Sequence, residues 1–308
     1  MNLITICIPT YNQCKKLEIL LNQIHKYNPN ISIVVSDNNS TDNTKKIIRK
    51  YQKKLKYLIF IKNNKNRGFD LNYLKTVKKV KTDYFWVLGS DEKIYNKSIL
   101  KINKIIKKLN FPDGITFVNN TKKINNFKNK ENFEKFKILT HSNYLGTISL
   151  NIIKKNKFIT KKFIKTNFGY IQIYYCIKKI VTNNNWYLYK YNSITKIDSN
   201  SIELRNNKKK YLERLDIDIK GYIFHIIKLL KKKNISVIKY KNLIFKKNIR
   251  PWIMESLMHH TKKEVITVLK KNSKYLRGIF YYKFLKFLIN ICPIFLIRFL
   301  IKTKRIFI

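Results

Sequence analysis

The chain is 308 residues long and carries 66 Lys and Arg against 17 Asp and Glu, a formal net charge of +49. Its hydrophobic fraction of 44% suffices for the core of one large domain or two modest ones, which excludes disorder throughout the chain. Alanine is absent and Lys, Asn, Ile, Tyr and Phe dominate, so much of the charge reflects a biased composition. Because the lysines are spread along the whole chain, we expect no nucleic-acid partner, although the positive field attracts phosphates and anionic membranes.

The cysteines and histidines predict neither a disulfide framework nor a metal centre. Cys7, Cys14, Cys176 and Cys292 form no C-x-x-C pair, which indicates a reducing compartment. No two histidines have the i, i+4 spacing of a helical metal site. The apolar run Leu3–Ile8 is short and lacks a basic flank, so we expect no signal peptide and a cytoplasmic protein.

Short apolar runs alternate with helical periodicity over the first 120 residues. Between the runs, apolar residues recur at spacings of three and four and predict helices with buried faces that begin near Leu17, Ile47, Tyr73 and Ile99. The alternation predicts a Rossmann-like α/β fold, with a mainly parallel sheet flanked by helices. The predicted strands are Leu3–Ile8, Ile31–Val35, Tyr57–Ile61, Tyr84–Leu88 and Ile115–Val118.

The second half of the chain has a different pattern. Asn119–Lys137 is polar with little periodicity and predicts a loop. From Tyr211 to Leu229, apolar residues recur in steps of three and four and predict a long amphipathic helix. We therefore divide the chain into an α/β domain at 1–205, with a ligand-binding half at about 1–120, and a helical region at 206–308.

The segment Phe280–Lys302 is the most apolar part of the helical region. Its longest uncharged run, Phe287–Ile297, has 11 residues, well short of the ~20 that span a bilayer. Aromatic and aliphatic residues interleaved with Lys and Arg are typical of a helix lying in a membrane interface. We therefore expect residues 280–308 to contact an anionic membrane surface, and a helix packed on the domain is the alternative.

Polar and acidic residues follow three of the predicted strands at the point where each strand ends. They are Pro9–Asn12, Ser36–Ser40 and Gly89–Glu92. Open α/β sheets bind their ligands at this edge, although turn and cap chemistry explains each segment taken alone. Two adjacent carboxylates in so basic a chain favour a site for Mg²⁺ or Mn²⁺.

Four successive segments resemble the blocks of family 2 inverting glycosyltransferases with the GT-A fold, in both order and spacing. They are Ile4–Asn12, Val34–Asp42, Asn66–Gly68 with Asn72, and Tyr84–Glu92. The resemblance implies an enzyme that transfers a sugar with inversion from a nucleoside-diphosphate donor, expected to be of UDP type. It also implies a glycan or lipid-linked acceptor in bacterial surface-polysaccharide synthesis, as in O-antigen, lipooligosaccharide or capsule, with the enzyme peripheral on the cytoplasmic face of the inner membrane.

The resemblance further implies roles for individual residues. Asp91 and Glu92 stand where the family carries its Asp-x-Asp motif and would hold Mn²⁺ or Mg²⁺, although relatives often have a third acid where this chain has Ser90. The implied nucleotide-sugar-binding residues are Pro9 and Tyr11 at the nucleobase, Asp37 and Asn38 at the base or ribose, and Asn12, Gly68, Asn72 and Asp91 elsewhere in the donor site, and Asp91 is also implied to be catalytic.

The resemblance also implies a general base that deprotonates the acceptor, usually an acid near a helix start in the second half. Phe168–Tyr175 occupies about that place and contains no acid, so His141, Asp198 and Glu203 are the alternatives, and His141 is our candidate. The rival function is a non-catalytic basic protein that binds nucleotides or nucleic acid on the same fold. Metal-dependent turnover of a nucleotide sugar separates the two functions.

Overall fold

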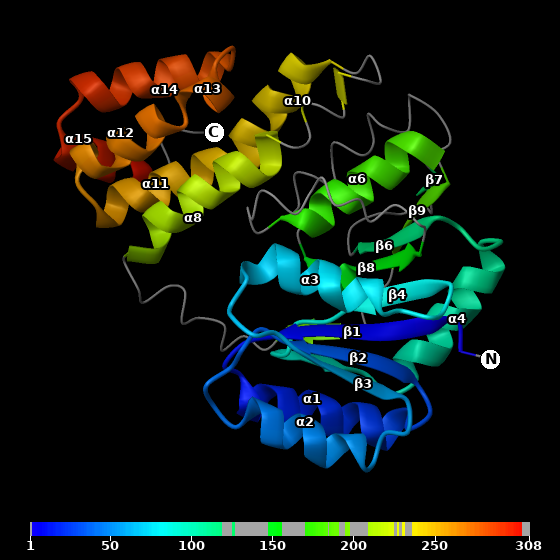
Figure 1. The fold of residues 1–308 in the computed structure, drawn as a ribbon. Helices are drawn as coiled ribbons and strands as arrows, with labels where there is room; N and C mark the ends of the chain where they lie inside the picture. The colour runs from blue at the N-terminus through cyan, green and yellow to red at the C-terminus, as the bar shows by residue number, and fades with distance from the viewer. Residues whose placement is uncertain are drawn as a thin grey trace. The chain divides into compact units, whose positions relative to one another are not determined.

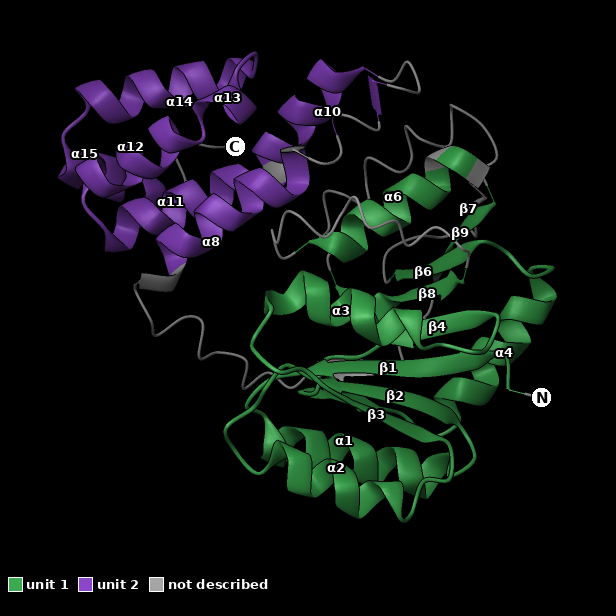
Figure 2. Cartoon of the chain, viewed as in Figure 1, with its two compact units in different colours: residues 1–136, 144–201 green, residues 137–143, 202–308 purple. Residues whose placement is uncertain are grey.

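The computed structural model consists of two compact units, residues 1–136 with 144–201 and residues 137–143 with 202–308 (Figure 2). The described part of the first unit is an α/β structure, and the described part of the second is helical (Figure 1). The structure describes residues 2–118, 125–126, 147–155, 170–183, 185–190, 195–197, 209–224, 227, 230–231 and 236–303. The predicted α/β class and the helical C-terminal region are confirmed.

The described part of unit 1 contains an eight-stranded sheet in the order β3-β2-β1-β4-β8-β6-β9-β7. Strands β3, β2, β1 and β4 are parallel, as are β6 and β9, whereas β8 runs antiparallel between β4 and β6. A separate ladder pairs β5 with β10. The strands are β1 Ile4–Thr10, β2 Ser32–Asp37, β3 Leu58–Lys62, β4 Tyr84–Val87, β5 Glu92–Ile94, β6 Gly114–Val118, β7 Asn125–Asn126, β8 Asn151–Lys154, β9 Trp186–Lys190 and β10 Thr195–Ile197.

Helices cover both faces of this sheet (Figure 1). They are α1 Cys14–Tyr27, α2 Thr44–Gln52, α3 Gly68–Lys78, α4 Ser98–Lys108 and α6 Ile171–Asn183. Because side chains alternate along a strand, β1 contributes to both faces. Ile6 belongs to the apolar cluster that includes Leu20 of α1 and Ile48 of α2, whereas Cys7 lies on the face of Tyr73 in α3. The core therefore has two layers, one on each side of the sheet.

Lys179 of α6 is a buried cation, only 6% exposed. Burial lowers the pKa of its ammonium group to about 8, and nearby Asp113 acts in the opposite direction. Since an unfolded lysine titrates near pH 10.5, the unfolded chain binds more protons than the folded chain between about pH 8 and pH 10.5. The contribution of Lys179 to the free energy of unfolding is therefore unfavourable below pH 8 and rises across this window.

The substitution Lys179→Met is expected to raise the free energy of unfolding by about 2–3 kcal/mol at pH 7, because it removes the cost of burying the charge. The gain should shrink toward zero as the pH approaches 10.5. Urea unfolding at pH 7 and pH 10 measures both values, with Lys104→Met at an exposed position of α4 as the matched control. An equal gain at both pH values would contradict the assignment to charge burial.

The described part of unit 2 consists of helices joined by short connections. The helix predicted from Tyr211 begins with α8 and continues into a π-helical turn, with Leu215, Ile219 and Tyr222 buried, while the end predicted near Leu229 lies outside the described residues. The helices are α8 Lys209–Ile219, α10 Val237–Ile244, α11 Arg250–His259, α12 Lys262–Lys271, α13 Ser273–Leu276, α14 Phe280–Ile291 and α15 Ile294–Lys302, with π-helical turns at Lys220–Phe224 and Phe245–Ile249. Among the described residues, no helix combines the length and apolar composition needed to cross a membrane.

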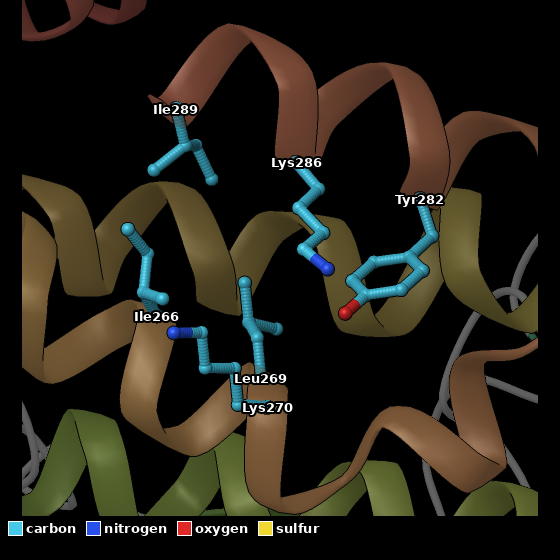
Figure 3. A pocket seen from close by; sticks show the side chains of 6 residues that line it. All are labelled: Ile266, Leu269, Lys270, Tyr282, Lys286 and Ile289. Carbon is cyan, nitrogen blue, oxygen red and sulfur yellow. The ribbon is translucent and has the colours of Figure 1, made fainter. Parts of the chain in front are cut away.

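A narrow, shallow hollow lies between α12 and α14 (Figure 3). Tyr282, Lys286 and Ile289 extend from α14 toward α12, so this is the inner side of α14. The hydroxyl of Tyr282 is buried there, and no residue in the described ranges hydrogen-bonds to it. None of the residues predicted to bind a nucleotide sugar lines this hollow, whose other lining residues are Ile266, Leu269 and Lys270 of α12.

Candidate functional site

The loops that follow β1, β2 and β4 are tied together by hydrogen bonds. The backbone N–H of Asn12 donates to Ser40 Oγ at 2.8 Å, and Asn12 Oδ1 accepts from the N–H of Thr41 at 2.9 Å. On the other side, Ser90 Oγ donates to Gln13 Oε1 at 2.9 Å. Because β1 lies between β2 and β4, these contacts join the three loops into one rim at the carboxyl edge of the sheet, where the site is predicted.

Asp37 is the last residue of β2 and lies at this rim. Only one of its two carboxylate oxygens accepts hydrogen bonds from described residues. Asp37 Oδ1 accepts hydrogen bonds from the N–H and the hydroxyl of Ser40, at 2.9 and 2.5 Å. Asp37 Oδ2 is buried and accepts no hydrogen bond from any described residue, and the buried hydroxyl of Thr10, the register neighbour on β1, likewise has no partner in the described part of the chain. An unsatisfied buried acceptor costs about 1–3 kcal/mol, so a ligand that donates hydrogen bonds here stabilises the site.

A buried network of amide side chains lies beneath the rim. Asn72 Oδ1 accepts from Ser36 Oγ at 2.7 Å and from Asn63 Nδ2 at 3.0 Å, and Asn72 Nδ2 donates to the carbonyl of Ser36 at 2.9 Å. Asn38 Oδ1 accepts from Asn63 Nδ2 and from the N–H of Arg67, both at 3.0 Å. Asn38 and Asn72 thus position the strand ends, and contact of either with a donor stays a prediction. Asn63 was missed, and its only signal is its position directly after β3.

Gly68 begins α3 in a conformation that suits glycine. Its φ is +76°, in the left-handed region that glycine enters at no steric cost. The N–H of Gly68 donates to Asn66 Oδ1 at 2.9 Å, and Asn38 Nδ2 donates to the same oxygen at 2.7 Å. The predicted donor-pocket turn is therefore connected through Asn38 to the loop that follows β2.

The two acids that follow β4 have different environments. Glu92 is 6% exposed, and its two carboxylate oxygens accept from Ser149 Oγ at 2.7 Å and from the N–H of Gly89 at 3.1 Å. Burial raises the pKa of Glu92 to about 7, against the effect of these hydrogen bonds and with a smaller contribution from the charge of Asp91. Asp91 is only partly buried, and no described residue hydrogen-bonds to its carboxylate. A methyl group on Gly89 would lie 2.6 Å from Asp91 Oδ1, so glycine leaves room for this carboxylate.

Of the two acids, only Asp91 has a carboxylate that is available to a divalent cation without breaking a hydrogen bond to a described residue. Mg²⁺ is commonly held by one or two carboxylates together with substrate phosphates and water, which Asp91 fits. Glu92 fits only if it gives up its contact with Ser149 or Gly89. Across the described ranges, no three His, Cys, Asp or Glu side chains group into a metal site. The residues present therefore fit an ion held jointly by Asp91 and a bound diphosphate.

The remaining predicted residues divide between the rim and undescribed parts of the chain. Pro9 is partly buried near the end of β1, and Tyr11 lies at the rim with 44% of its surface exposed. His141, our candidate base, lies outside the described residues, as do Asp198 and Glu203. Ser149 was not predicted, because it reaches Glu92 from 57 positions away in the sequence.

Comparison with known proteins supports the predicted family. Residues 5–168 match the model of glycosyl transferase family 2. The match covers more than half of the chain, and the chain belongs to this family. Abequosyltransferase RfbV of Salmonella typhimurium is 41% identical over 101 residues, which are 32% of this chain and 30% of that protein. The match thus spans less than a third of that relative's length.

Two solved structures resemble this chain in fold. The mannosyltransferase PcManGT from Pyrobaculum calidifontis, solved with GDP-Man and Mn²⁺, has a TM-score of 0.54 at 12% identity, over 88% of this chain and 75% of that one. TarS 1–349 of S. aureus, solved with UDP, has a TM-score of 0.52 at 14% identity, over 89% of both chains. The GT-A fold expected from the sequence is confirmed.

Proposed function

We propose that this chain is an inverting glycosyltransferase that takes its sugar from a UDP-type nucleoside-diphosphate donor and requires Mn²⁺ or Mg²⁺. The observation behind this proposal is the pair of unsatisfied acceptors, Asp37 Oδ2 and Thr10 Oγ1, at adjacent strand ends of a family 2 fold. A nucleobase N–H or a ribose hydroxyl supplies the hydrogen bonds that this edge lacks.

Each acid has its own part in the proposed reaction. A bound cation between Asp91 and the diphosphate would neutralise the charge that develops on the leaving nucleoside diphosphate. Glu92 holds the backbone N–H of Gly89 and so positions the loop that presents Asp91. The acceptor hydroxyl attacks the anomeric carbon opposite the leaving group, and His141 is proposed to take its proton.

The proposed acceptor is a glycan or a lipid-linked glycan of a bacterial surface polysaccharide such as O-antigen, lipooligosaccharide or capsule. The partial similarity to an abequosyltransferase supports this class of product. The proposed place of action is the cytoplasmic face of the inner membrane, which the net charge of +49 and the apolar C-terminal helices favour. The rival function is nucleotide binding without catalysis on the same fold. That function would not require the available carboxylate of Asp91.

Titration calorimetry with UDP tests the proposal. In the presence of Mn²⁺, Asp37→Ala is expected to weaken UDP binding by about 10- to 100-fold, because a buried hydrogen bond to the nucleoside is lost. The control is Asp83→Ala, an exposed acid just before β4, and melting temperatures show whether each variant folds. Unchanged UDP affinity in a folded Asp37→Ala would remove Asp37 from the site. Release of UDP from a panel of UDP-sugars separates an enzyme from a binding protein.

A further inference from the structure

The outer face of α14 is aromatic. Tyr282, Leu285 and Ile289 are buried on the inner side of this helix, where Tyr282 and Ile289 line the hollow against α12 (Figure 3). The opposite side exposes large apolar residues at helical spacing, namely Phe280, Phe284, Phe287 and Ile291. A surface helix normally places polar side chains on its outer face. This helix is apolar on both sides, so its outer face is suited to a partner other than water.

Helix α15 adds to this apolar surface. Ile297 is its buried residue, whereas Phe295 and Phe299 are 72% and 54% exposed. Half of all the large apolar side chains that are exposed in the described parts of the chain lie between residues 280 and 299. Isolated exposed apolar residues are ordinary, but a concentrated group of them marks an interaction surface. We call the exposed apolar residues of α14 and α15 the aromatic face.

The charges carried by α14 and α15 themselves all have one sign. Lys283 and Lys302 are exposed beside the aromatic face, and neither forms an ion pair with any described residue. No Asp or Glu follows Glu264 in the sequence. A second copy of this chain brings the same cations and is repelled, whereas an anionic surface is attracted. The charge therefore favours an anionic partner with an apolar interior.

We propose that the aromatic face lies in the interface of an anionic phospholipid bilayer. The phenylalanine side chains contact the acyl boundary, and Lys283 and Lys302 contact lipid phosphates. Helices α14 and α15, of 12 and 9 residues, lie along the surface, each being shorter than the ~20 residues that span a bilayer. This inference rests on the proposed membrane location and gives it a defined surface, but it does not depend on sugar transfer.

Sedimentation with vesicles tests the aromatic face directly. The full chain is expected to bind vesicles of phosphatidylcholine with phosphatidylglycerol more tightly than vesicles of phosphatidylcholine alone. The double variant Phe284→Ser/Phe287→Ser should weaken binding to the anionic vesicles by about 10- to 100-fold, with an unchanged melting temperature because both side chains are exposed. The matched control is Ile238→Ser, an apolar position on α10 that is 62% exposed in the same unit. Equal loss in this control, or no loss in the double variant, would overturn the proposal.

The charges are tested by a second pair of variants. Lys283→Gln/Lys302→Gln should weaken binding to the anionic vesicles by about 10-fold and reduce its sensitivity to salt, whereas Lys104→Gln/Lys107→Gln, at exposed positions of α4 in unit 1, should not. Equal binding to neutral and anionic vesicles would overturn the electrostatic part of the proposal.

UDP calorimetry on the same preparations separates this inference from the proposed function. A chain that binds UDP but no vesicles overturns only the membrane face, and one that binds vesicles but not UDP overturns only the proposed function. Sedimentation velocity measures whether the chain associates with a second copy of itself. The unmutated chain could form a dimer and fail to bind vesicles. If Phe284→Ser/Phe287→Ser abolishes that dimer, the aromatic face contacts a second copy of the chain, and the proposal is overturned.

Discussion

Replacing Asp91 by asparagine is expected to lower the rate of sugar transfer by about 10²- to 10³-fold, because the developing charge on the diphosphate loses its stabilisation. The substitution keeps the shape of the side chain and removes its negative charge. The carboxylate of Asp91 has no hydrogen-bond partner among the described residues, so its loss should leave the melting temperature unchanged. Release of UDP from a UDP-sugar that the unmutated chain turns over measures the effect.

The coupling between Mn²⁺ binding and UDP binding provides a second test of the role of Asp91. In the unmutated chain, Mn²⁺ should tighten UDP binding relative to a chelator, and UDP should tighten Mn²⁺ binding by the same factor, because the coupling between two ligands is reciprocal. Asp91→Asn should abolish this coupling, whereas Asp83→Asn, an exposed acid at the opposite end of β4, should retain it. Transfer by Asp91→Asn at the unmutated rate, with the coupling intact, would show that Asp91 is not a ligand.

The largest loss of stability is expected from Gly114→Ala in β6. A methyl group on Gly114 would lie 2.3 to 2.5 Å from the ring of Trp186, its neighbour on β9. Trp186 is fully buried, and its indole N–H donates to Thr116 Oγ1 at 2.9 Å, so the ring cannot shift without losing this hydrogen bond. We expect a loss of about 1–3 kcal/mol in the free energy of unfolding and a melting temperature lower by roughly 3–10 °C.

Two further variants identify the cause of this loss. In Gly278→Ala, the added methyl group has no atom within 4 Å, but the backbone at this position has a φ of +84°. This variant therefore measures the cost of backbone strain in the absence of a steric clash. Combining Gly114→Ala with Trp186→Leu removes the ring, and should cost less than the sum of the two single substitutions because the clash is relieved. Additive losses would show that the contact between residue 114 and the ring is not the source of the instability.

Local periodicity made the first repeats of the sheet predictable. Ile4, Ile6 and Ile8 alternate in β1, and Leu17, Leu20, Leu21 and Ile24 recur at helical spacing in α1, so each element is specified by its near neighbours. Strand β8, in contrast, is not specified by the residues near it in the sequence. It enters the sheet antiparallel between β4 and β6, and its place depends on pairing with segments far away in the sequence. Gly114 shows the same limit, because only the position of Trp186 explains why it has no side chain.

For the site, the strand pattern predicts which side chains reach the carboxyl edge, because a residue that directly follows a parallel strand lies at that edge. Asp37 and Asp91 were predicted on this basis, together with Glu92. The different environments of the acids could not be predicted in this way, because hydrogen bonding and burial depend on contacts between residues that are distant in the sequence. Ser149 engages Glu92 from 57 positions away, while Asp91 stays available and Asp37 keeps one unsatisfied oxygen. In the same way, aromatic and aliphatic residues interleaved with Lys and Arg predicted an amphipathic C-terminal segment. Packing against α12 then determines which side of α14 is buried and leaves its phenylalanines exposed.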